Sequence, residues 1–252
     1  MNKNKTEKNI TEYFGKVNSF TRAELYDYYR QFQPELKYQT FGWRLYELKR
    51  KKIINEVKKG VYQINGKKTY QPLIDEKMKE IYSKITNEFF DINLVIWSTK
   101  WINDFSLHQT FHNFYILETE YEYSESLFNK MKELNIPNVF LKPDDKLISK
   151  YVIGEDEPIV IKNLISKSPI KKLEEIKIPT LEKIIVDLFC DKKVFYMYQG
   201  HELKEILRNA VSDYTLNFTK LFHYARRRGK EAEIKLYFSE KLSDYVQGIL
   251  DD

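Results

Sequence analysis

The fold of the first part of the chain is decided by residues 38–64, which read YQTFGWRLYELKRKKIINEVKKGVYQI. Phe41, Leu45 and Leu48 recur at the three- and four-residue spacing of one helical face, which predicts an amphipathic helix over residues 38–52. The rest of this helix is polar or basic, so its free face is expected to meet solvent or a polar partner. The side chains expected on that face are Thr40, Arg44, Glu47 and Lys51.

Two helices are expected before this stretch and a β-hairpin at its end. Apolar residues at positions 10–14 fit a short first helix, and the pair Thr21 and Glu24 has the spacing of a capping box that starts a second one. Beyond the third helix, residues 53–57 and 61–64 are short β-forming runs joined by a turn at Gly60. Three helices followed by a hairpin predict a winged helix-turn-helix domain over residues 1–72.

In that architecture the third helix enters the major groove of duplex DNA. Residues near its start lie closest to the base edges, where Arg44 suits guanine and Gln39 suits adenine. A second set of basic residues is expected along the phosphates, and Tyr62 adds a contact from the wing. For Trp43 a packing role is the alternative, and a winged helix can also bind proteins. The expected base-reading residues are Tyr38, Gln39, Thr40, Trp43 and Arg44, and the expected phosphate contacts are Lys37, Arg50, Lys51, Lys58 and Lys59.

Charge is divided unevenly along the chain. Residues 1–72 hold 16 Lys and Arg against 7 Asp and Glu, whereas the remainder holds 26 against 30. A basic first part joined to a mildly acidic second part points to a polyanionic partner for the basic part, and double-stranded DNA is the natural candidate. A solvated, lysine-rich surface is the alternative interpretation.

The second part of the chain, residues 73–252, is expected to be an α/β domain with a helical end. Residues 74–90 have the periodicity of a helix, which we expect to bridge the two domains. Apolar runs then alternate with helical patterns such as residues 124–134. The expected strands are Leu94–Trp97, Phe114–Leu117, Val139–Leu141 and Ile159–Ile161, and the expected C-terminal helices are residues 180–189, 202–214 and 218–228, with a helix or strand at 234–238.

Composition excludes several classes of protein. The single cysteine, Cys190, rules out an internal disulfide and a four-cysteine zinc module. Glycines form neither a Walker A nor a dinucleotide loop, and the common hydrolase signatures are missing, so we expect no cofactor. No segment approaches the roughly 20 apolar residues of a membrane span, and the N-terminus lacks the apolar stretch of a secretory signal. We therefore expect a cytoplasmic protein without a membrane partner.

Three sets of residues are candidates for chemistry in the second part. His108 and His112 have metal-ligand spacing if helical, although no third ligand is evident. Alternate carboxylates at Glu118, Glu120 and Glu122 suit Mg²⁺ if extended, with a solvated strand edge as the commoner outcome. Pro143-Asp144 with Glu175-Ile176-Lys177 matches the sparse pattern of restriction-type nucleases. A basic run, Arg226-Arg227-Arg228, suits either a helix C-terminus or a partner contact.

The chain resembles the AbiEi-type antitoxin and transcriptional-regulator family of type IV toxin-antitoxin systems over most of its length. The resemblance rests on Leu48–Ile54 and Lys59–Tyr62, and more specifically on Ile178–Leu188 with Tyr224–Arg227. Where many relatives have an arginine, this chain has Lys183.

This resemblance implies that the first domain binds operator repeats and represses its own operon. The second domain would neutralise a nucleotidyltransferase-like toxin in phage defence by abortive infection, without catalysis and without a stable toxin complex being assumed. The alternative from the residues themselves is a metal-dependent restriction-type nuclease with a winged-helix DNA-targeting domain.

Overall fold

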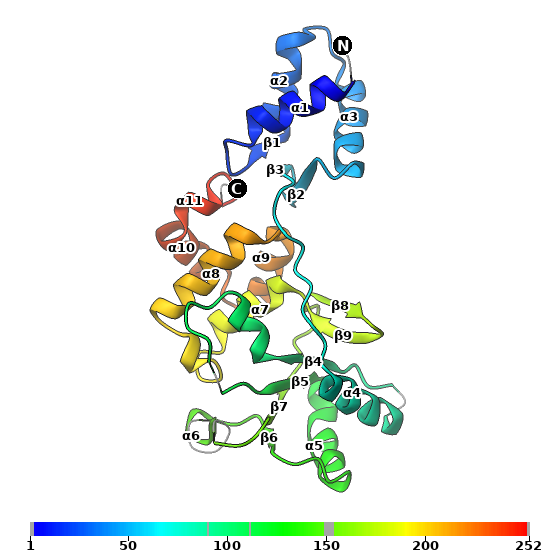
Figure 1. Cartoon of the computed structure of the whole chain (residues 1–252), viewed down its shortest axis with the longest axis vertical. Coiled ribbons are helices and arrows are strands. Elements are labelled where there is room, and N and C mark those ends of the chain that lie inside the picture. Colours follow the sequence, from blue (N-terminus) through cyan, green and yellow to red (C-terminus); the bar gives the residue numbers. More distant parts are fainter. Residues whose placement is uncertain (1–2, 90, 111, 149–153, 251–252) are drawn as a thin grey trace.

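The computed structural model of the chain describes residues 3–89, 91–110, 112–148 and 154–250. It has a small lobe, residues 3–64, and a large lobe, residues 76–250, which a strap of residues 65–75 connects (Figure 1). Buried apolar residues form one cluster in each lobe. The chain is therefore a mixed α and β protein with two hydrophobic cores.

The small lobe contains three helices and a three-stranded antiparallel sheet in the order β1-β3-β2. Helices α2 and α3 begin and end close to the residues that the sequence predicts, whereas α1 begins well before the short helix expected at residues 10–14. The bounds are Lys3–Phe14 for α1, Arg22–Phe32 for α2, Tyr38–Arg50 for α3, Phe20–Thr21 for β1, Ile54–Lys58 for β2 and Val61–Ile64 for β3.

Local signals account for the start of α2 and for the core beneath it. Both halves of the predicted capping box form, because the Thr21 hydroxyl accepts from the Glu24 backbone N–H and the Glu24 carboxylate accepts from the Thr21 backbone N–H. The core is rich in aromatic rings, with the centroids of Phe14 and Phe20 4.1 Å apart. Phe41 and its apolar neighbours on α3 are buried as their spacing predicts.

The large lobe is built around a four-stranded sheet in the order β4-β5-β7-β6. Strands β5, β7 and β6 are parallel, and β4 is antiparallel to β5. All four strands lie where apolar runs predict them. Their bounds are Val95–Ser98 for β4, Tyr115–Thr119 for β5, Val139–Leu141 for β6 and Ile159–Asn163 for β7.

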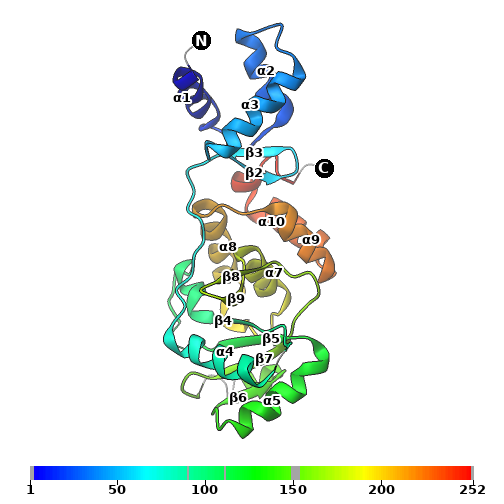
Figure 2. The ribbon, with the colours of Figure 1, turned by 90° about the vertical axis from the view of Figure 1, so that its right-hand side faces the viewer.

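Helices cover this sheet, and a helical bundle completes the lobe between the sheet and the small lobe (Figure 2). A hairpin of β8 and β9, which the sequence does not predict, packs against β4. Residues 234–238, for which the sequence predicts either a helix or a strand, are part of a helix, α10. The bounds are Glu76–Glu88 for α4, Ser124–Glu133 for α5, Asp145–Leu147 for α6, Ile170–Leu173 for β8, Ile176–Pro179 for β9, Leu181–Cys190 for α7, His201–Asp213 for α8, Phe218–Arg227 for α9, Glu231–Lys241 for α10 and Ser243–Val246 for α11, with 3-10 turns at Thr99–Asp104, Tyr121–Tyr123 and Tyr196–Tyr198.

The expected bridging role of the helix at residues 74–90 is wrong. Its apolar residues Met78, Ile81 and Ile85 are buried in the core of the large lobe, so α4 packs against the main sheet, away from the small lobe (Figure 1). The extended strap makes the connection instead. Lys68 in the strap exchanges backbone hydrogen bonds with Asp213 and Thr215, which fastens the strap to the large lobe.

The two lobes also meet directly at the turn between β2 and β3. Val57 and Val61, on either side of this turn, are buried among core residues of the large lobe. The backbone N–H of Lys59 donates to the hydroxyl of Thr219 on α9, at 3.3 Å. Ser19, at the edge of the small lobe, donates to the Gln247 carbonyl at 2.8 Å. The small lobe is thus anchored at its hairpin end, opposite the tips of α2 and α3.

Candidate nucleic-acid interface

One face of α3 is open to solvent, and two aromatic side chains dominate it. Trp43 and Tyr46 are 54% and 60% exposed, and Gln39 and Arg50 lie on the same helical face at spacings of four, three and four residues. We call these four residues the α3 stripe. No element of the large lobe lies over α3 in Figure 2, so the α3 stripe is accessible to a partner.

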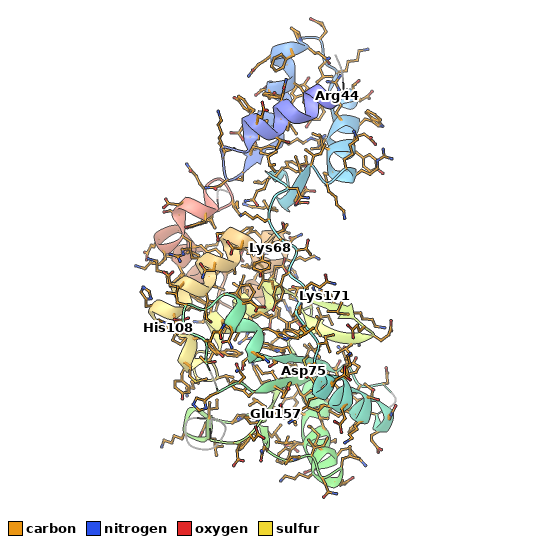
Figure 3. All side chains as sticks on the ribbon, viewed as in Figure 1. Arg44, Lys68, Asp75, His108, Glu157 and Lys171 are labelled. Atoms are coloured by element: carbon orange, nitrogen blue, oxygen red, sulfur yellow. The ribbon has the colours of Figure 1, made fainter. Side chains whose placement is uncertain are left out.

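The polar face expected from the sequence lies next to this stripe and is partly covered. Glu47 is only 8% exposed, and it accepts a hydrogen bond from Arg50 at 2.8 Å. The guanidinium of Arg44, labelled in Figure 3, donates to the Gln33 side chain at 2.7 Å and lies over the Tyr29 ring. Packing of α2 against α3 therefore partly covers Arg44, and Glu47 is buried, whereas Thr40 stays exposed.

The ends of α3 carry most of the expected phosphate contacts. Lys37 is exposed at the position preceding the helix, and Tyr38, Gln39 and Thr40 in the first turn are also exposed. Arg50 and Lys51 are exposed at the C-terminal end, where the helix dipole favours cations. These residues lie at the two ends of the α3 stripe, as contacts to flanking phosphates require.

The expected wing contacts are placed differently. Tyr62 is 3% exposed, and its ring packs against Phe20 in the small core, so its side chain is not presented to a partner. Lys58 ends β2, and Lys59 lies in the turn that meets the large lobe. The turn faces α9 because the valines that flank it enter the core of the large lobe. We therefore omit Tyr62, Lys58 and Lys59 from the candidate interface.

Tyr46 is the interface residue that the sequence reasoning missed. An aromatic residue in an amphipathic helix is normally assigned to the core, yet Tyr46 lies three residues from Trp43 and outside the Phe41, Leu45 and Leu48 face. Helical spacing alone was enough to place it on the exposed side.

The second notable cluster is a buried ion network in the large lobe. The ammonium group of Lys183 on α7 is fully buried and contacts the carboxylates of Glu118 at 2.6 Å and Asp187 at 2.5 Å. Burial by itself lowers the pKa of Lys183, but the two carboxylates outweigh it and hold that pKa above its ordinary value. The indole N–H of Trp97 also donates to Glu118. Glu118 is therefore a structural residue, and the alternate carboxylates expected at a solvated edge do not form a row.

The network continues to the surface through the arginines at the C-terminal end of α9. Arg228 contacts Asp187 at 2.7 Å and Asp191 at 2.5 Å. Burial raises the pKa of Asp191, but Lys162 and Arg228 outweigh this and lower it. Arg226 is paired with Glu231 on α10. The basic run at the end of α9 is thus engaged within the large lobe.

The nuclease-like residues are not brought together. Asp144 caps the turn at Leu147 and lies beside α6, whereas Glu175 is 93% exposed in the β8–β9 turn on the other side of the lobe (Figure 1). Lys177 donates to the Asn93 side chain. Within the part of the chain that the structure describes, no three His, Cys, Asp or Glu side chains are arranged to hold a metal ion.

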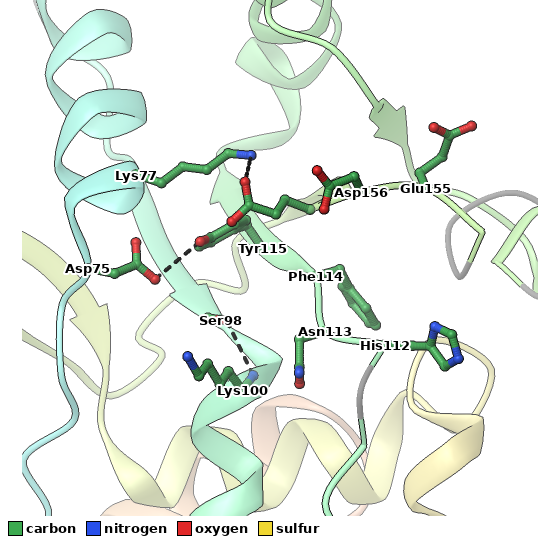
Figure 4. Close-up of a pocket in the computed structure, with 11 residues that line it drawn as sticks. Asp75, Lys77, Ser98, Lys100, His112, Asn113, Phe114, Tyr115, Glu155 and Asp156 are labelled. Carbon is green, nitrogen blue, oxygen red and sulfur yellow. Dashed lines mark hydrogen bonds and ion pairs between the residues drawn. The ribbon is translucent and has the colours of Figure 1, made fainter.

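The two histidines considered as metal ligands also lie at different sites. His108, labelled in Figure 3, contacts Glu202 on α8 at 3.2 Å, whereas His112 lines a polar cavity of about 520 Å³ beside the first residue of β5 (Figure 4). In this cavity the Tyr115 hydroxyl donates to Asp75, and burial, aided by Asp75 and Glu157, raises the pKa of that hydroxyl. The phenol therefore stays protonated and ties α4 to the sheet.

Comparison with known families gives one match. The model of a protein family of unknown function, DUF6577, matches residues 40–244, from the first turn of α3 to near the end of the large lobe. A comparison with curated proteins finds no match to the chain. Across the described residues no helix combines the length and the apolar character needed to cross a bilayer.

Proposed function

The chain belongs to this family of unknown function, and we propose that it is a transcriptional regulator that binds duplex DNA through α3. The observation that carries the proposal is the exposed α3 stripe on the lobe that holds the excess of basic residues. A positively charged surface attracts the phosphate backbone at long range, and an exposed helix of this length fits the major groove.

In this proposal the small lobe is a winged helix-turn-helix. The order of three helices and a hairpin supports it. The short strand β1, which follows α1 and precedes α2 in the sequence, also supports it because it pairs with β3 of the hairpin. Here α2 and α3 are the helix-turn-helix, and α3 is the recognition helix. The β2–β3 hairpin, by contrast, holds the lobe on the rest of the protein.

Each member of the α3 stripe has a role that its chemistry suits. The Gln39 amide pairs with adenine, and the faces of Trp43 and Tyr46 make apolar contacts with thymine methyl groups. Lys37, Arg50 and Lys51 contact phosphates at either end. The Arg44 guanidinium holds α2 against α3 through Gln33, so a contact with guanine would first require that hydrogen bond to open.

Selection from a random duplex library tests this function. The purified chain is expected to enrich a defined sequence, and affinity is then measured by fluorescence anisotropy. Gln39→Ala and Trp43→Ala are expected to weaken binding to the enriched sequence roughly tenfold, because each removes a contact to base edges. Tyr196→Ala, an exposed aromatic in the large lobe, is the matched control and leaves affinity unchanged.

A protein partner for the same stripe is the competing possibility, because exposed aromatics are also enriched at protein interfaces. The dependence of affinity on salt concentration distinguishes a DNA partner from a protein partner. DNA binding falls steeply as salt rises, by a slope that counts the neutralised phosphates. A library that yields no enriched sequence, or an affinity that Gln39→Ala and Trp43→Ala leave intact, would refute the DNA-binding role of α3.

We also propose an antitoxin role for the large lobe, on the strength of the resemblance in Ile178–Leu188 and Tyr224–Arg227. Lys183, Asp187 and Tyr224 in these segments all belong to the buried ion network, since the Tyr224 hydroxyl donates to Asp187 at 2.8 Å. The resemblance therefore concerns the core of this lobe. Co-expression of the full chain with a nucleotidyltransferase-like toxin tests the role, and growth rescue is the expected result, whereas continued growth arrest would refute it.

A further inference from the structure

A small basic cavity lies at the carboxyl ends of the parallel strands β6 and β7. Its volume is about 240 Å³. In open α/β sheets, ligands bind at the carboxyl ends of the strands, where the loops diverge. We call it the strand-end cavity. It is lined by Lys142, Pro143, Lys162, Asn163, Ile165, Asp191, Val194 and Arg228.

The walls of the strand-end cavity carry an excess of positive charge. Lys162 and Arg228 both contact the carboxylate of Asp191, and Arg228 also contacts the buried carboxylate of Asp187. Lys142 adds a third cation, and its ammonium group lies 4.4 Å from the centre of the Tyr121 ring. Among the described residues no carboxylate is paired with Lys142. With Asp187 and Asp191 balancing Lys162 and Arg228, the charge of Lys142 is left over, and this excess favours an anionic ligand.

A further observation points to a ligand. The side-chain oxygen of Asn163 is buried and has no hydrogen-bond partner in the described part of the molecule. Buried acceptors are normally satisfied, so this oxygen lacks a donor that a ligand would bring.

We propose that the strand-end cavity binds a small molecule that carries a phosphate group next to a hydroxyl group. The phosphate contacts Lys142 together with Lys162 and Arg228, and the hydroxyl donates to Asn163. The phosphate group comes either from a small phosphate ester or from free hydrogen phosphate, which has its own hydroxyl. This binding is independent of the DNA contact through α3, because the cavity lies in the large lobe.

Calorimetric titration of the full chain with glycerol 3-phosphate, inorganic phosphate and sulfate tests the proposal. Saturable binding of one or both phosphates is expected, with sulfate weaker because it lacks a hydroxyl donor. Tighter binding of the ester assigns the site to a phosphate ester, whereas equal binding assigns it to free phosphate. Absence of saturable phosphate binding, or sulfate binding as tight as phosphate, would overturn the proposal.

Two matched lysine variants locate the site. Lys142→Ala is expected to weaken phosphate binding by about tenfold or more, the loss typical of a charge-assisted hydrogen bond. Lys132→Ala is the control, because Lys132 is also an exposed lysine stacked on an aromatic ring of the large lobe, at 4.1 Å from the Phe128 ring centre, but does not line the cavity. Equal losses in both variants, or none in Lys142→Ala, would contradict the assignment.

Discussion

Lys37 before α3 and Lys183 within α7 show how differently the two lobes use positive charge. Lys37 is exposed in a lobe whose sequence holds twice as many basic as acidic residues. Lys183 is fully buried, and carboxylates of Glu118 and Asp187 surround it. The first charge is available to a partner, whereas the second is already neutralised inside the protein.

Exposed and buried cations have different roles, the first in binding a partner and the second in stabilising the fold. Surface cations in excess produce a field that reaches a polyanion before contact, and they contribute little to stability. A buried cation contributes to the fold only if its partners are present, and removing one member leaves the others unpaired in a poorly solvated site. Replacing the exposed Lys37 should therefore weaken DNA binding without changing stability. Replacing the buried Lys183 should lower stability.

The largest expected effect is on the buried network. Lys183→Ala should lower the free energy of unfolding by about 3–5 kcal/mol, because it leaves the Glu118 carboxylate buried without a cation and leaves Asp187 with Arg228 alone. Chemical denaturation followed by circular dichroism measures this loss. Lys220→Ala, an exposed lysine on α9, is the control and should change stability by less than about 0.5 kcal/mol. If the two variants were equally stable, the network would have no architectural role.

A smaller effect, dependent on pH, is expected at the outer end of the network. The pKa of Asp191 is lowered in the folded protein because Lys162 and Arg228 outweigh the effect of burial. Its contribution to stability is therefore complete above the unfolded pKa of about 4 and disappears as pH falls through the lower folded pKa.

Asp191→Asn makes this contribution measurable. At pH 7 the variant should be less stable than the wild type by about 2 kcal/mol, the usual range for a charge-assisted hydrogen bond. The difference should shrink as the pH of the denaturation experiment falls below about 4. A difference that stays constant down to the acid unfolding limit would mean that the Asp191 charge is not responsible.

Features that depend on neighbouring residues were predictable from the sequence. Helical spacing locates the buried face of α3, and the pair Thr21 and Glu24 locates the start of α2. Apolar runs likewise locate all four strands of the main sheet. These signals are local, so they do not require knowledge of which elements pack together.

Features set by distant contacts were not predictable. Lysines are rarely buried, so the sequence around Lys183 does not predict that this residue lies at the centre of a buried ion network. Val57 and Val61 resemble ordinary hairpin residues, yet they dock onto a lobe that follows later in the chain. Strands β8 and β9 were missed because lysines at 171, 172 and 177 mask their alternation. The contacts of Arg44 were not predictable for the same reason, because its partners Gln33 and Tyr29 belong to another part of the small lobe.

The smallest expected effect tests the other half of the comparison. Lys37→Ala should leave the free energy of unfolding unchanged within about 0.5 kcal/mol, because an exposed side chain loses little on truncation. It should nevertheless reduce the slope of log affinity against log salt by about 1 for any duplex, since one phosphate contact is lost. Lys192→Ala, an exposed lysine of the large lobe, should leave that slope unchanged. A slope insensitive to Lys37 but altered by Lys192 would move the DNA-binding surface from α3 to the large lobe, and the division of roles between the two lobes would fail with it.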